Sequence, residues 1–235
     1  MKISIVTITR NNAEGLRQTL QSVYSQSFSD IEHIIVDGNS NDASAAVLAE
    51  AAELGSLVVK REPRGVYDAI NVGLEHAHGG VIGLLHAGDV LDNENIISTI
   101  SQAFAGNEHP DFVYGDVRIG KRLYSGQRAS RQSLLSGFAP PHPSLFVTAG
   151  TMRAAGPYST EYAISGDYEM FLRLFFNDAL SGHYMPLVTT LMAPGGLSAK
   201  WRNRLFVNNR ERLRALRSHN LPASPLRLLK RYLYL

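Results

Sequence analysis

The sequence predicts an α/β domain with a mostly parallel, doubly wound sheet. Strand-like and helix-like patterns alternate four times within the first hundred residues, an order typical of a parallel sheet with helices on both faces. The segment 81–85 is wholly apolar, as buried parallel strands usually are. With 235 residues, of which 44% are hydrophobic, the chain is long enough to bury one sizeable core.

The N-terminal half supplies the four strand–helix pairs. Residues 2–9 are rich in β-branched side chains and predict the first strand. Asn11 and Glu14 have the spacing of a capping box, and apolar residues over 16–24 then follow at helical spacing. The turn cluster GNSND, with Asp42 as the cap, predicts the start of the second helix. The other predicted strands are 31–37, 57–60 and 81–85, and the other predicted helices are 43–54, 66–77 and 96–104.

Beyond the fourth helix the alternation is less regular. The segment 118–126 is typical of a hairpin with its turn at Gly120 and Lys121. Apolar residues at helical spacing predict a helix over 166–176. Further strands are predicted over 112–117, 144–148 and 182–190.

The end of the chain differs in charge from the rest. The whole chain has a net charge of +2, but residues 199–235 hold ten Lys or Arg against one acid, Glu211. We therefore expect a domain over 1–198 and a basic helical extension over 199–235, with helices over 201–218 and 225–234. An anionic membrane surface is the favoured partner of this extension, because apolar and basic residues share its last helix. Packing on the domain is a second interpretation, and nucleic-acid binding is disfavoured because no nucleic-acid motif accompanies the charge.

Composition also restricts the setting. The chain has no cysteine, which excludes disulfides and thiolate metal sites and fits a reducing compartment. No run reaches the ~18 apolar residues of a membrane span, and the N-terminus lacks the pattern of a secretory signal. A cytoplasmic location is expected.

Polar side chains follow the predicted strands where a ligand should bind. In open α/β sheets the ligand crevice lies at the carboxyl ends of the strands. The sequence lacks GxGxxG and GxxxxGK[ST] loops, so a phosphate group there needs another source of positive charge. A Mg²⁺ or Mn²⁺ ion held by a carboxylate such as Asp89 can supply it. The side chains delivered by the first, second and fourth strands are Thr9, Arg10, Asn11, Asp37, Asn39, Ser40, His86 and Asp89.

Eight segments, spread in order from the first strand to the beginning of the extension, form a recognisable set. They are SIVTITRN at 4–11, IIVDGNSND at 34–42, GVYDAINVGLEHAHG at 65–79, GLLHAGDVL at 83–91, VYGDV at 113–117, PHPSLFV at 141–147, ISGDYEMFLRL at 164–174 and GGLS at 195–198. Together they resemble the family 2 glycosyltransferases of the GT-A fold. Within that family they are most similar to the branch used for bacterial exopolysaccharide, colanic-acid-like and lipopolysaccharide sugars.

The resemblance implies a nucleotide-sugar site on the N-terminal half. Asp37 would accept a hydrogen bond from the base, usually uracil, and the strand-one residues would line the same pocket. Asp89 would be the carboxylate that holds the Mn²⁺ or Mg²⁺ ion; the family often has two acids in this motif, whereas HAGD has one. The remaining residues expected at the nucleotide sugar are Thr9, Arg10, Asn11, Asp68, Asn71 and His86.

The resemblance also implies a general base, Asp167 in the segment SGDYE. It would take the proton of the acceptor hydroxyl while that oxygen attacks the anomeric carbon opposite the leaving group, so that the configuration inverts. Glu169 is the second choice for this base. Asp116 is equally consistent with substrate binding and with a structural role, and His142 could meet metal or diphosphate, although a structural role is more common for a lone histidine.

Simpler interpretations exist for the three main acids. Asp37 could cap the second helix, Asp89 could be a turn residue, and Asp167 could cap its own helix. Asp42 is better placed than Asp37 as a cap, and a base that also caps is held rigidly, so we favour function for all three.

The sequence therefore predicts an inverting, metal-dependent glycosyltransferase that uses a nucleoside-diphosphate sugar, with UDP favoured. The expected acceptor is a polyprenyl-diphosphate-linked saccharide at the inner face of the membrane, in surface polysaccharide assembly. Two alternatives remain: a nucleotidyltransferase on the same sheet, which would release pyrophosphate, and a sugar-nucleotide-binding module without turnover.

Overall fold

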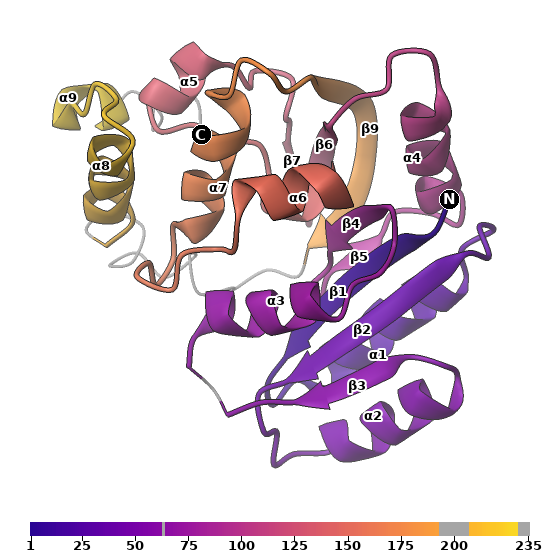
Figure 1. Ribbon diagram of the computed structural model, residues 1–235. Helices are drawn as coiled ribbons and strands as arrows, with labels where there is room; N and C mark the ends of the chain where they lie inside the picture. The colour runs from indigo at the N-terminus through magenta and orange to yellow at the C-terminus, as the bar shows by residue number, and fades with distance from the viewer. Residues whose placement is uncertain (63, 193–206, 230–235) are drawn as a thin grey trace.

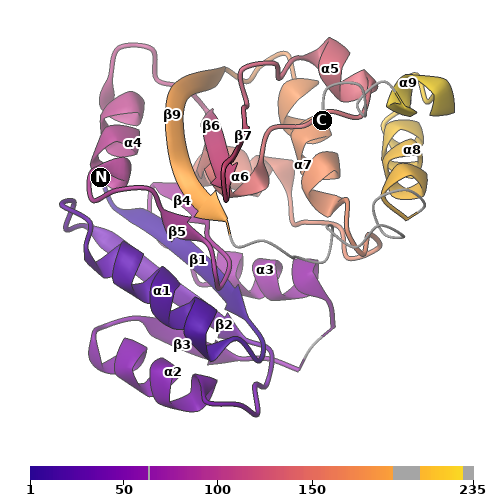
Figure 2. The same ribbon diagram turned by 180° about the vertical axis from the view of Figure 1, so that it is seen from behind.

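A computed structural model describes residues 1–62, 64–192 and 207–229 and shows one twisted sheet with helices on both faces (Figures 1 and 2). Its strand order is β3-β2-β1-β4-β8-β6-β9-β5, with β7 paired to β6. The strands are β1 Ile3–Thr9, β2 Ile31–Asp37, β3 Leu57–Lys60, β4 Val81–Leu84, β5 Val90–Leu91, β6 Phe112–Ile119, β7 Arg122–Tyr124, β8 Phe146–Thr148 and β9 Gly182–Met192. The helices are α1 Ala13–Tyr24, α2 Ser44–Glu53, α3 Val66–Glu75, α4 Ile96–Ala105, α5 Arg131–Leu135, α6 Ala149–Ala155, α7 Gly166–Phe175, α8 Asn208–Ser218 and α9 Pro225–Leu229, with a 3-10 turn η1 at His142–Ser144.

The four N-terminal strands form the predicted parallel half of the sheet. β1 pairs in parallel with β2 and β4, and β2 pairs in parallel with β3. The register places Thr9 opposite Asp37, so the first two strands end side by side. This part of the fold confirms the prediction, and it brings the carboxyl ends of β1, β2 and β4 to one edge.

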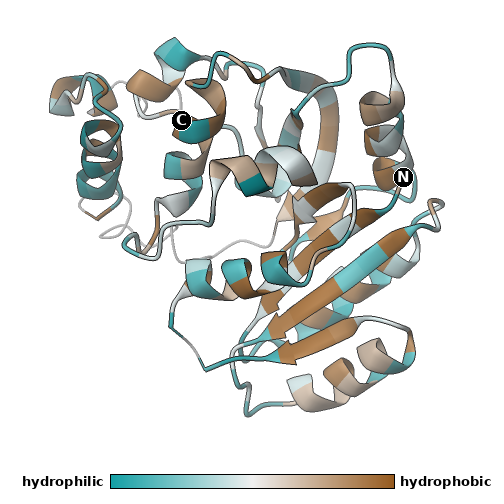
Figure 3. Ribbon diagram, viewed as in Figure 1, coloured by the Kyte–Doolittle hydropathy of each residue, from teal (hydrophilic) through white to brown (hydrophobic). Residues whose placement is uncertain are grey.

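Helices cover both faces because the side chains of β1 alternate. Val6 and Ile8 face α3 and the larger core that includes α7, whereas Ile3 and Ile5 face the core that contains α4. In β2, Ile35 packs with residues of α1 and α2 on that second side. Figure 3 shows apolar residues concentrated along these strands. The doubly wound arrangement is thus confirmed.

The second half of the sheet is mixed. β8 runs antiparallel to both β4 and β6, while β6 and β9 pair in parallel with irregular register between Tyr114 and Val117. The predicted hairpin exists, with its turn at Gly120 and Lys121 between β6 and β7. The sequence did not predict α5, α6, η1 or the two-residue strand β5.

Helix starts differ in detail from the predictions. Asn12, not Asn11, caps α1: its Oδ1 accepts from the Gly15 amide at 3.1 Å. Asn11 has a positive φ of 50°, which makes it the turn residue before the cap. The residue that flanks α2 is Ala43 rather than the predicted Asp42, although Asp42 Oδ1 accepts from the Ser44 amide, the first of the helix, at 3.0 Å.

The basic extension contributes two helices to the described part of the chain. α8 packs on α7, with Ala215 and Leu216 fully buried, and Leu228 of α9 is buried as well. The GGLS segment, the first residues of the predicted helix at 201–218 and the end of the one at 225–234 lie outside the described residues. In the described ranges every helix is too short or too polar to span a bilayer.

Candidate active site

Backbone and side-chain hydrogen bonds join the loops that follow β1 and β2. The Gly38 amide donates to the Thr9 carbonyl at 2.9 Å. The Asn11 amide donates to Ser40 Oγ, and Asn11 Oδ1 accepts from the Asn41 amide, both at 2.8 Å. Asn11 can make both bonds because its left-handed backbone turns the residue toward the second loop. The two loops therefore form one surface.

The loop after β4 is attached to the same surface. Asn12 Nδ2 donates to the Ala87 carbonyl at 2.9 Å. The buried hydroxyl of Thr19 on α1 donates to the Asp89 carbonyl at 2.8 Å and accepts from the Gly88 amide at 3.0 Å. The segment His86 to Asp89 is thus held in place against α1, beside the loop that carries Thr9.

Asp37 lies at the end of β2, beside Thr9 of β1, and is 2% exposed. Its carboxylate accepts from the Ser40 amide at 3.2 Å and from Ser40 Oγ at 2.6 Å, which closes the turn after β2. The Arg10 side chain lies beside this turn, against Gly38. Asp37 therefore shapes the loop but does not cap α2, as expected from the position of Asp42.

Two buried polar atoms at this edge have no hydrogen-bond partner within the described ranges. They are Thr9 Oγ1, at the end of β1, and His86 Nδ1, after β4. A buried polar group without a partner costs about 1–3 kcal/mol, so such atoms are unusual unless a ligand or water completes them. Their position at the carboxyl ends of β1 and β4 matches the crevice expected for an open α/β sheet.

Asp89 is the last residue of the loop between β4 and β5, and it is buried. In the part of the chain that the structure describes, no three His, Asp or Glu side chains gather into a metal-binding group. One carboxylate nevertheless suits Mg²⁺ or Mn²⁺, because these ions are commonly held by one or two carboxylates together with substrate phosphates. The donor set fits a cation that arrives with a diphosphate rather than one bound in an all-protein cage.

Asp167 is the second residue of α7, where the chain enters the helix. Its amide donates to the Tyr67 hydroxyl at 3.2 Å, and its Oδ1 accepts from the Tyr168 amide at 2.7 Å. The Tyr67 hydroxyl also donates to the Ile164 carbonyl at 2.6 Å. Burial raises the pKa of Asp167, and the positive charge of Arg212 opposes that rise. A carboxylate with a raised pKa is a better proton acceptor, as a general base requires.

His86 connects the two sides of the site. Its ring lies 6.1 Å from the ring of His142, and its charge state is coupled to Asp167. Burial lowers the pKa of His86 to about 3, with a further lowering from His142, while Asp167 opposes the change. His142 Nε2 lies 2.9 Å from the Tyr158 hydroxyl, and burial lowers the pKa of His142 to about 4. With these pKa values both rings are neutral at pH 7.

The sequence comparisons decide the family. Residues 4–154 match the family described as Glycosyl transferase family 2. This chain belongs to that family. A PGL/p-HBAD biosynthesis glycosyltransferase of Mycobacterium bovis is 33% identical over 201 residues, which cover 83% of this chain and 78% of its own. An uncharacterized glycosyltransferase of Mycobacterium tuberculosis is 30% identical over 178 residues, 73% of this chain and 68% of its own.

Solved structures share the fold of this glycosyltransferase. A crystal structure of S. aureus TarS 1–349 in complex with UDP-GlcNAc has a TM-score of 0.74 and 14% identity, and covers 92% of this chain and 66% of its own. The mannosyltransferase PcManGT from Pyrobaculum calidifontis, in complex with GDP-Man and Mn²⁺, has a TM-score of 0.67 and 19% identity. The match covers 91% of this chain and 64% of the PcManGT chain. The GT-A fold and the class of nucleotide-sugar-dependent glycosyltransferase are confirmed, and neither alternative class is retained. The narrower polysaccharide branch stays a prediction.

Two residues predicted at the nucleotide are engaged in other contacts of the glycosyltransferase. Asp68 forms an ion pair with Arg61, with Arg61 Nε 3.1 Å from Asp68 Oδ2. Asn71 exchanges two hydrogen bonds of 2.8 Å with the backbone of Tyr158, so its amide joins α3 to the segment before α7. In this structure Asn71 shapes the site and does not present a free amide to it.

The lower-ranked acids are also engaged. Burial alone would raise the pKa of Glu169, but its hydrogen bonds and ion pairs with His219 and Arg173 lower the pKa below the ordinary value. Asp116 Oδ1 accepts from Ser125 Oγ, the Gly126 amide and the Tyr184 hydroxyl at 2.8–3.0 Å. These contacts favour Asp167 as the base and a structural role for Asp116.

Sequence reasoning missed the residues that surround Asp167 from distant segments. The sequence pattern does not single out Tyr67, Tyr158, Glu211 or Arg212 as neighbours of Asp167. The sequence contains little that links these residues to Asp167, because each comes close to it only through the tertiary fold. The tyrosine rings at 67 and 158 stack in parallel at 5.9 Å, which the sequence could not reveal.

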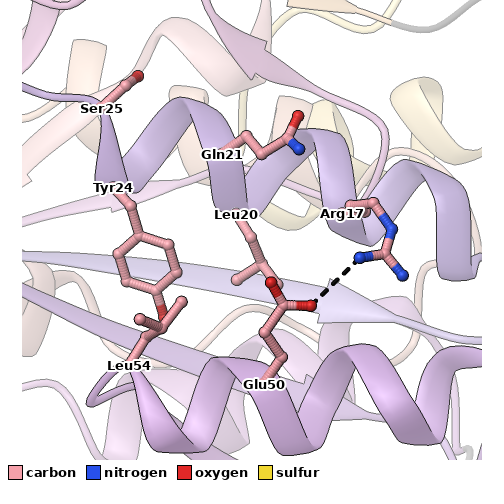
Figure 4. Close-up of a pocket in the computed structure, with 7 residues that line it drawn as sticks. All are labelled: Arg17, Leu20, Gln21, Tyr24, Ser25, Glu50 and Leu54. Atoms are coloured by element: carbon pink, nitrogen blue, oxygen red, sulfur yellow. Dashed lines mark hydrogen bonds and ion pairs between the residues drawn. The ribbon is translucent and has the colours of Figure 1, made fainter.

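A groove between α1 and α2 lies away from these residues (Figure 4). It is lined by the C-terminal halves of the two helices, which point toward the opposite edge of the sheet from the carboxyl ends of the strands. An exposed ion pair between Arg17 and Glu50, 3.2 Å long, crosses it. None of the predicted site residues lines this groove. Its residues are Arg17, Leu20, Gln21, Tyr24, Ser25, Glu50 and Leu54.

Proposed function

We propose that this glycosyltransferase moves one sugar, with inversion of configuration, from a nucleoside diphosphate to an acceptor hydroxyl, and that Asp167 is the general base. The observation that carries the proposal is the position of Asp167 at the start of α7, half-buried, with its amide on the Tyr67 hydroxyl and its carboxylate on the Tyr168 amide. The Asp167 carboxylate takes the proton from the acceptor hydroxyl. The hydroxyl oxygen then bonds to the anomeric carbon as the bond from that carbon to the diphosphate oxygen breaks.

The nucleotide occupies the edge formed by the loops after β1, β2 and β4. The two unpartnered polar atoms, Thr9 Oγ1 and His86 Nδ1, support this placement because a ligand there would complete them. Arg10, Asn11 and Asp37 belong to the same hydrogen-bonded surface. UDP is the favoured nucleotide, by analogy with the UDP-GlcNAc held by S. aureus TarS.

Asp89 would hold the divalent metal, Mn²⁺ or Mg²⁺. The presence of Mn²⁺ in the PcManGT complex supports this choice of ion. When bound, the cation stabilises the negative charge that develops on the departing diphosphate. The protein's part is to keep the Asp89 loop fixed through Thr19 and Asn12, so that the carboxylate does not have to be ordered during binding.

The acceptor we propose is a lipid-linked saccharide, with the enzyme peripheral to the cytoplasmic face of the membrane. The relative named for PGL/p-HBAD biosynthesis supports a role in cell-surface glycan or glycolipid assembly. The basic extension provides the membrane contact: Leu226 is 77% exposed on α9, next to the exposed Arg227. The surface-polysaccharide branch is the pathway class that this proposal favours.

A thermal-shift and turnover experiment tests the proposal. UDP-glucose, UDP-GlcNAc, GDP-mannose and dTDP-rhamnose are each added with and without Mn²⁺, and water is the acceptor of the sugar in the turnover measurement. We expect one UDP-sugar with Mn²⁺ to raise Tm, since a ligand at 100 times its Kd stabilises by about 2.7 kcal/mol. Asp89→Ala should lose the Mn²⁺-dependent part of that shift. Asp167→Asn should keep the whole shift but lose at least about 100-fold in release of UDP. Full turnover in Asp167→Asn would rule out this base.

A further inference from the structure

Helix α8 of the basic extension contacts the turn that carries Asp167. Glu211, the one acid of residues 199–235, accepts hydrogen bonds from three successive amides. The amides of Ala163, Ile164 and Ser165 lie 2.8, 3.0 and 2.8 Å from its carboxylate oxygens. These three residues directly precede Gly166, the first residue of α7.

The carboxylate of Glu211 is well suited to fix this turn. Hydrogen bonds with one charged partner are roughly twice as strong as neutral ones, and three converge on one group here. Ser165 is the residue that flanks α7 at its start, and its side chain makes no capping bond to the helix. Instead, Ser165 Oγ donates to Asn208 Oδ1 at 3.1 Å, so α8 holds the backbone and the side chain of this residue together.

Arg212 adds a second contact from the same helix. Its guanidinium carbon lies 4.5 Å from the centre of the Tyr168 ring, and its Nε donates to Asn208 Oδ1 at 2.5 Å. A cation over a tyrosine ring contributes about 0.5–2 kcal/mol. Tyr168 follows Asp167 directly, so α8 contacts the residues on both sides of the catalytic carboxylate.

Tyr67 of α3 holds the turn from the opposite side. Its hydroxyl bonds to the Ile164 carbonyl and the Asp167 amide, while its ring packs on Gly166 so closely that a Cβ there would stand 2.8 Å from ring carbons. Residues 163–168 are therefore clamped between α3, in the nucleotide-binding half, and α8, in the extension. Figure 1 shows α8 beside α7, on the side away from the N-terminal strands.

We propose that α8 is a positioning element of the active site, and that Glu211 is the positioning residue that fixes the turn carrying Asp167. This inference rests on the proposed role of Asp167 as the base. The basic extension then has a function beyond any membrane contact, because α8 helps to hold the turn that carries the base. A displacement of about 1 Å at a reacting group can lower the rate about 100-fold, so a change at Glu211 acts on turnover although the residue touches no substrate.

The test compares Glu211→Gln and Glu211→Ala with Arg217→Ala, an exposed change on the same helix. Turnover is followed as UDP released from UDP-GlcNAc and UDP-glucose in the presence of Mn²⁺, with water as the acceptor of the sugar. We expect kcat to fall about 10- to 100-fold in Glu211→Ala and less in Glu211→Gln, whose amide oxygen still accepts. Donor KM should change less than twofold, and Arg217→Ala should match the natural sequence in both constants.

Hydrogen exchange measured by mass spectrometry gives a readout that does not need turnover. Amides of residues 163–168 should exchange at least about tenfold faster in Glu211→Ala, with β1 and β2 unchanged. Unchanged exchange at 163–168 in Glu211→Ala, or an equal loss of donor binding and turnover, would overturn the inference. Failure of Glu211→Gln to fold would also overturn it, since the role of Glu211 would then be purely structural. If Asp167→Asn keeps full turnover, the base assignment fails; if Asp167→Asn is inactive and Glu211→Ala is normal, only the role of Glu211 fails.

Discussion

At the residue scale, the surroundings of Asp167 favour a carboxylate that can both take up and release a proton. Burial raises its pKa, whereas Arg212 and the two helix amides that it faces favour the charged form. A base whose pKa were raised without limit would be protonated at neutral pH and inactive. Burial is the larger effect, and the nearby guanidinium limits the rise and so keeps the ionised form accessible.

Tyr67→Phe tests the hydroxyl that holds Asp167. The variant removes the 2.6 Å bond to the Ile164 carbonyl and leaves the Asp167 amide without its acceptor. We expect a loss of about 1–3 kcal/mol in the free energy of unfolding, because buried groups lose their partner. We also expect kcat to fall about tenfold, with donor KM nearly unchanged. Urea unfolding and UDP release measure the two effects.

Tyr162→Phe is the matched control for that change. Tyr162 is buried to a similar degree, but its hydroxyl lies 3.5 Å from Ser218 Oγ, at the limit of a hydrogen bond. This variant should lose less than about 1 kcal/mol in the free energy of unfolding and should keep its turnover. Equal losses in the two variants would mean that Tyr67 serves the core and not the position of Asp167.

At the element scale, α3 performs two tasks with one helix. Its Tyr67 end contacts the turn before α7, and its Gly73 end lies against β1 so closely that the helix backbone and the strand are near contact. The absence of a side chain at Gly73 permits this approach. The distance between α3 and β1 in turn decides how far Tyr67 reaches toward α7.

Gly73→Ala is expected to destabilise the fold although alanine favours a helix. An added Cβ would stand 2.2 Å from Val6 Cγ1 and 3.3 Å from Val36 Cγ2. Overpacking of this kind costs about 1–3 kcal/mol, which exceeds the gain in helix propensity of about 1 kcal/mol. Thermal unfolding should show a lower Tm. Val6→Ala in the same chain should recover part of the loss, because it removes the clashing methyl groups.

Gly150→Ala is the control at this scale. Gly150 lies in α6, where a Cβ would meet nothing within 4 Å, so only the gain in helix propensity remains. Its Tm should stay equal or rise. A Tm that falls equally in both variants would contradict the explanation by contact with β1.

The elements that the sequence predicted best are those whose pattern is local. The β-branched and apolar periods of the first hundred residues predicted β1 to β4 and α1 to α4, because each face of these elements is buried by its neighbours in the chain. The antiparallel pairing of β8 was not predictable, since a short apolar segment does not indicate whether it pairs in parallel or antiparallel with its neighbours. β5 is too short, at two residues, to carry any period.

The site was predictable to the same extent. Thr9, Asp37, His86 and Asp89 follow strands, so topology alone predicts that they share an edge. Glu211 could not be assigned in this way, because its three partners lie more than 40 residues earlier in the chain. Its one available signal was charge: a lone acid within a strongly basic segment suggests a specific partner, and here that partner is a set of backbone amides.

At the scale of the whole molecule, burial lowers the pKa of three histidines, of which His33 and His142 are buried and His86 is half-buried. The rings of His86, after β4, and His142, in η1, lie 6.1 Å apart, and His33 bonds to Thr7 Oγ1 and Ser56 Oγ at 2.9 and 3.0 Å beneath α1. Burial lowers the pKa of His33 and His142 to about 4 and that of His86 to about 3. Each ring must therefore remain neutral for the folded chain to keep its packing.

This arrangement predicts that stability falls between pH 7.5 and pH 5.5. In the unfolded chain the three histidines take up protons below about pH 6.5, whereas in the folded chain they do not until about pH 4 or lower. The contribution of these histidines to the free energy of unfolding is complete above about pH 6.5. It is lost as pH falls, at up to about 1.4 kcal/mol for each histidine and pH unit. The loss at pH 5.5 should approach about 4 kcal/mol, reduced by Asp167, whose raised pKa has the opposite sign. Urea unfolding at the two pH values measures it.

His33→Gln separates this effect from general acid sensitivity. His33 lies outside the proposed site, and the amide can still bond to Thr7 or Ser56, so the variant should fold and should lose about one third of the pH dependence. Carboxylates with lowered pKa, such as Glu169, lose their contribution only below this pH window, so they do not account for the slope. Equal stability at pH 7.5 and pH 5.5 in the natural sequence would show that the rings are already charged or exposed.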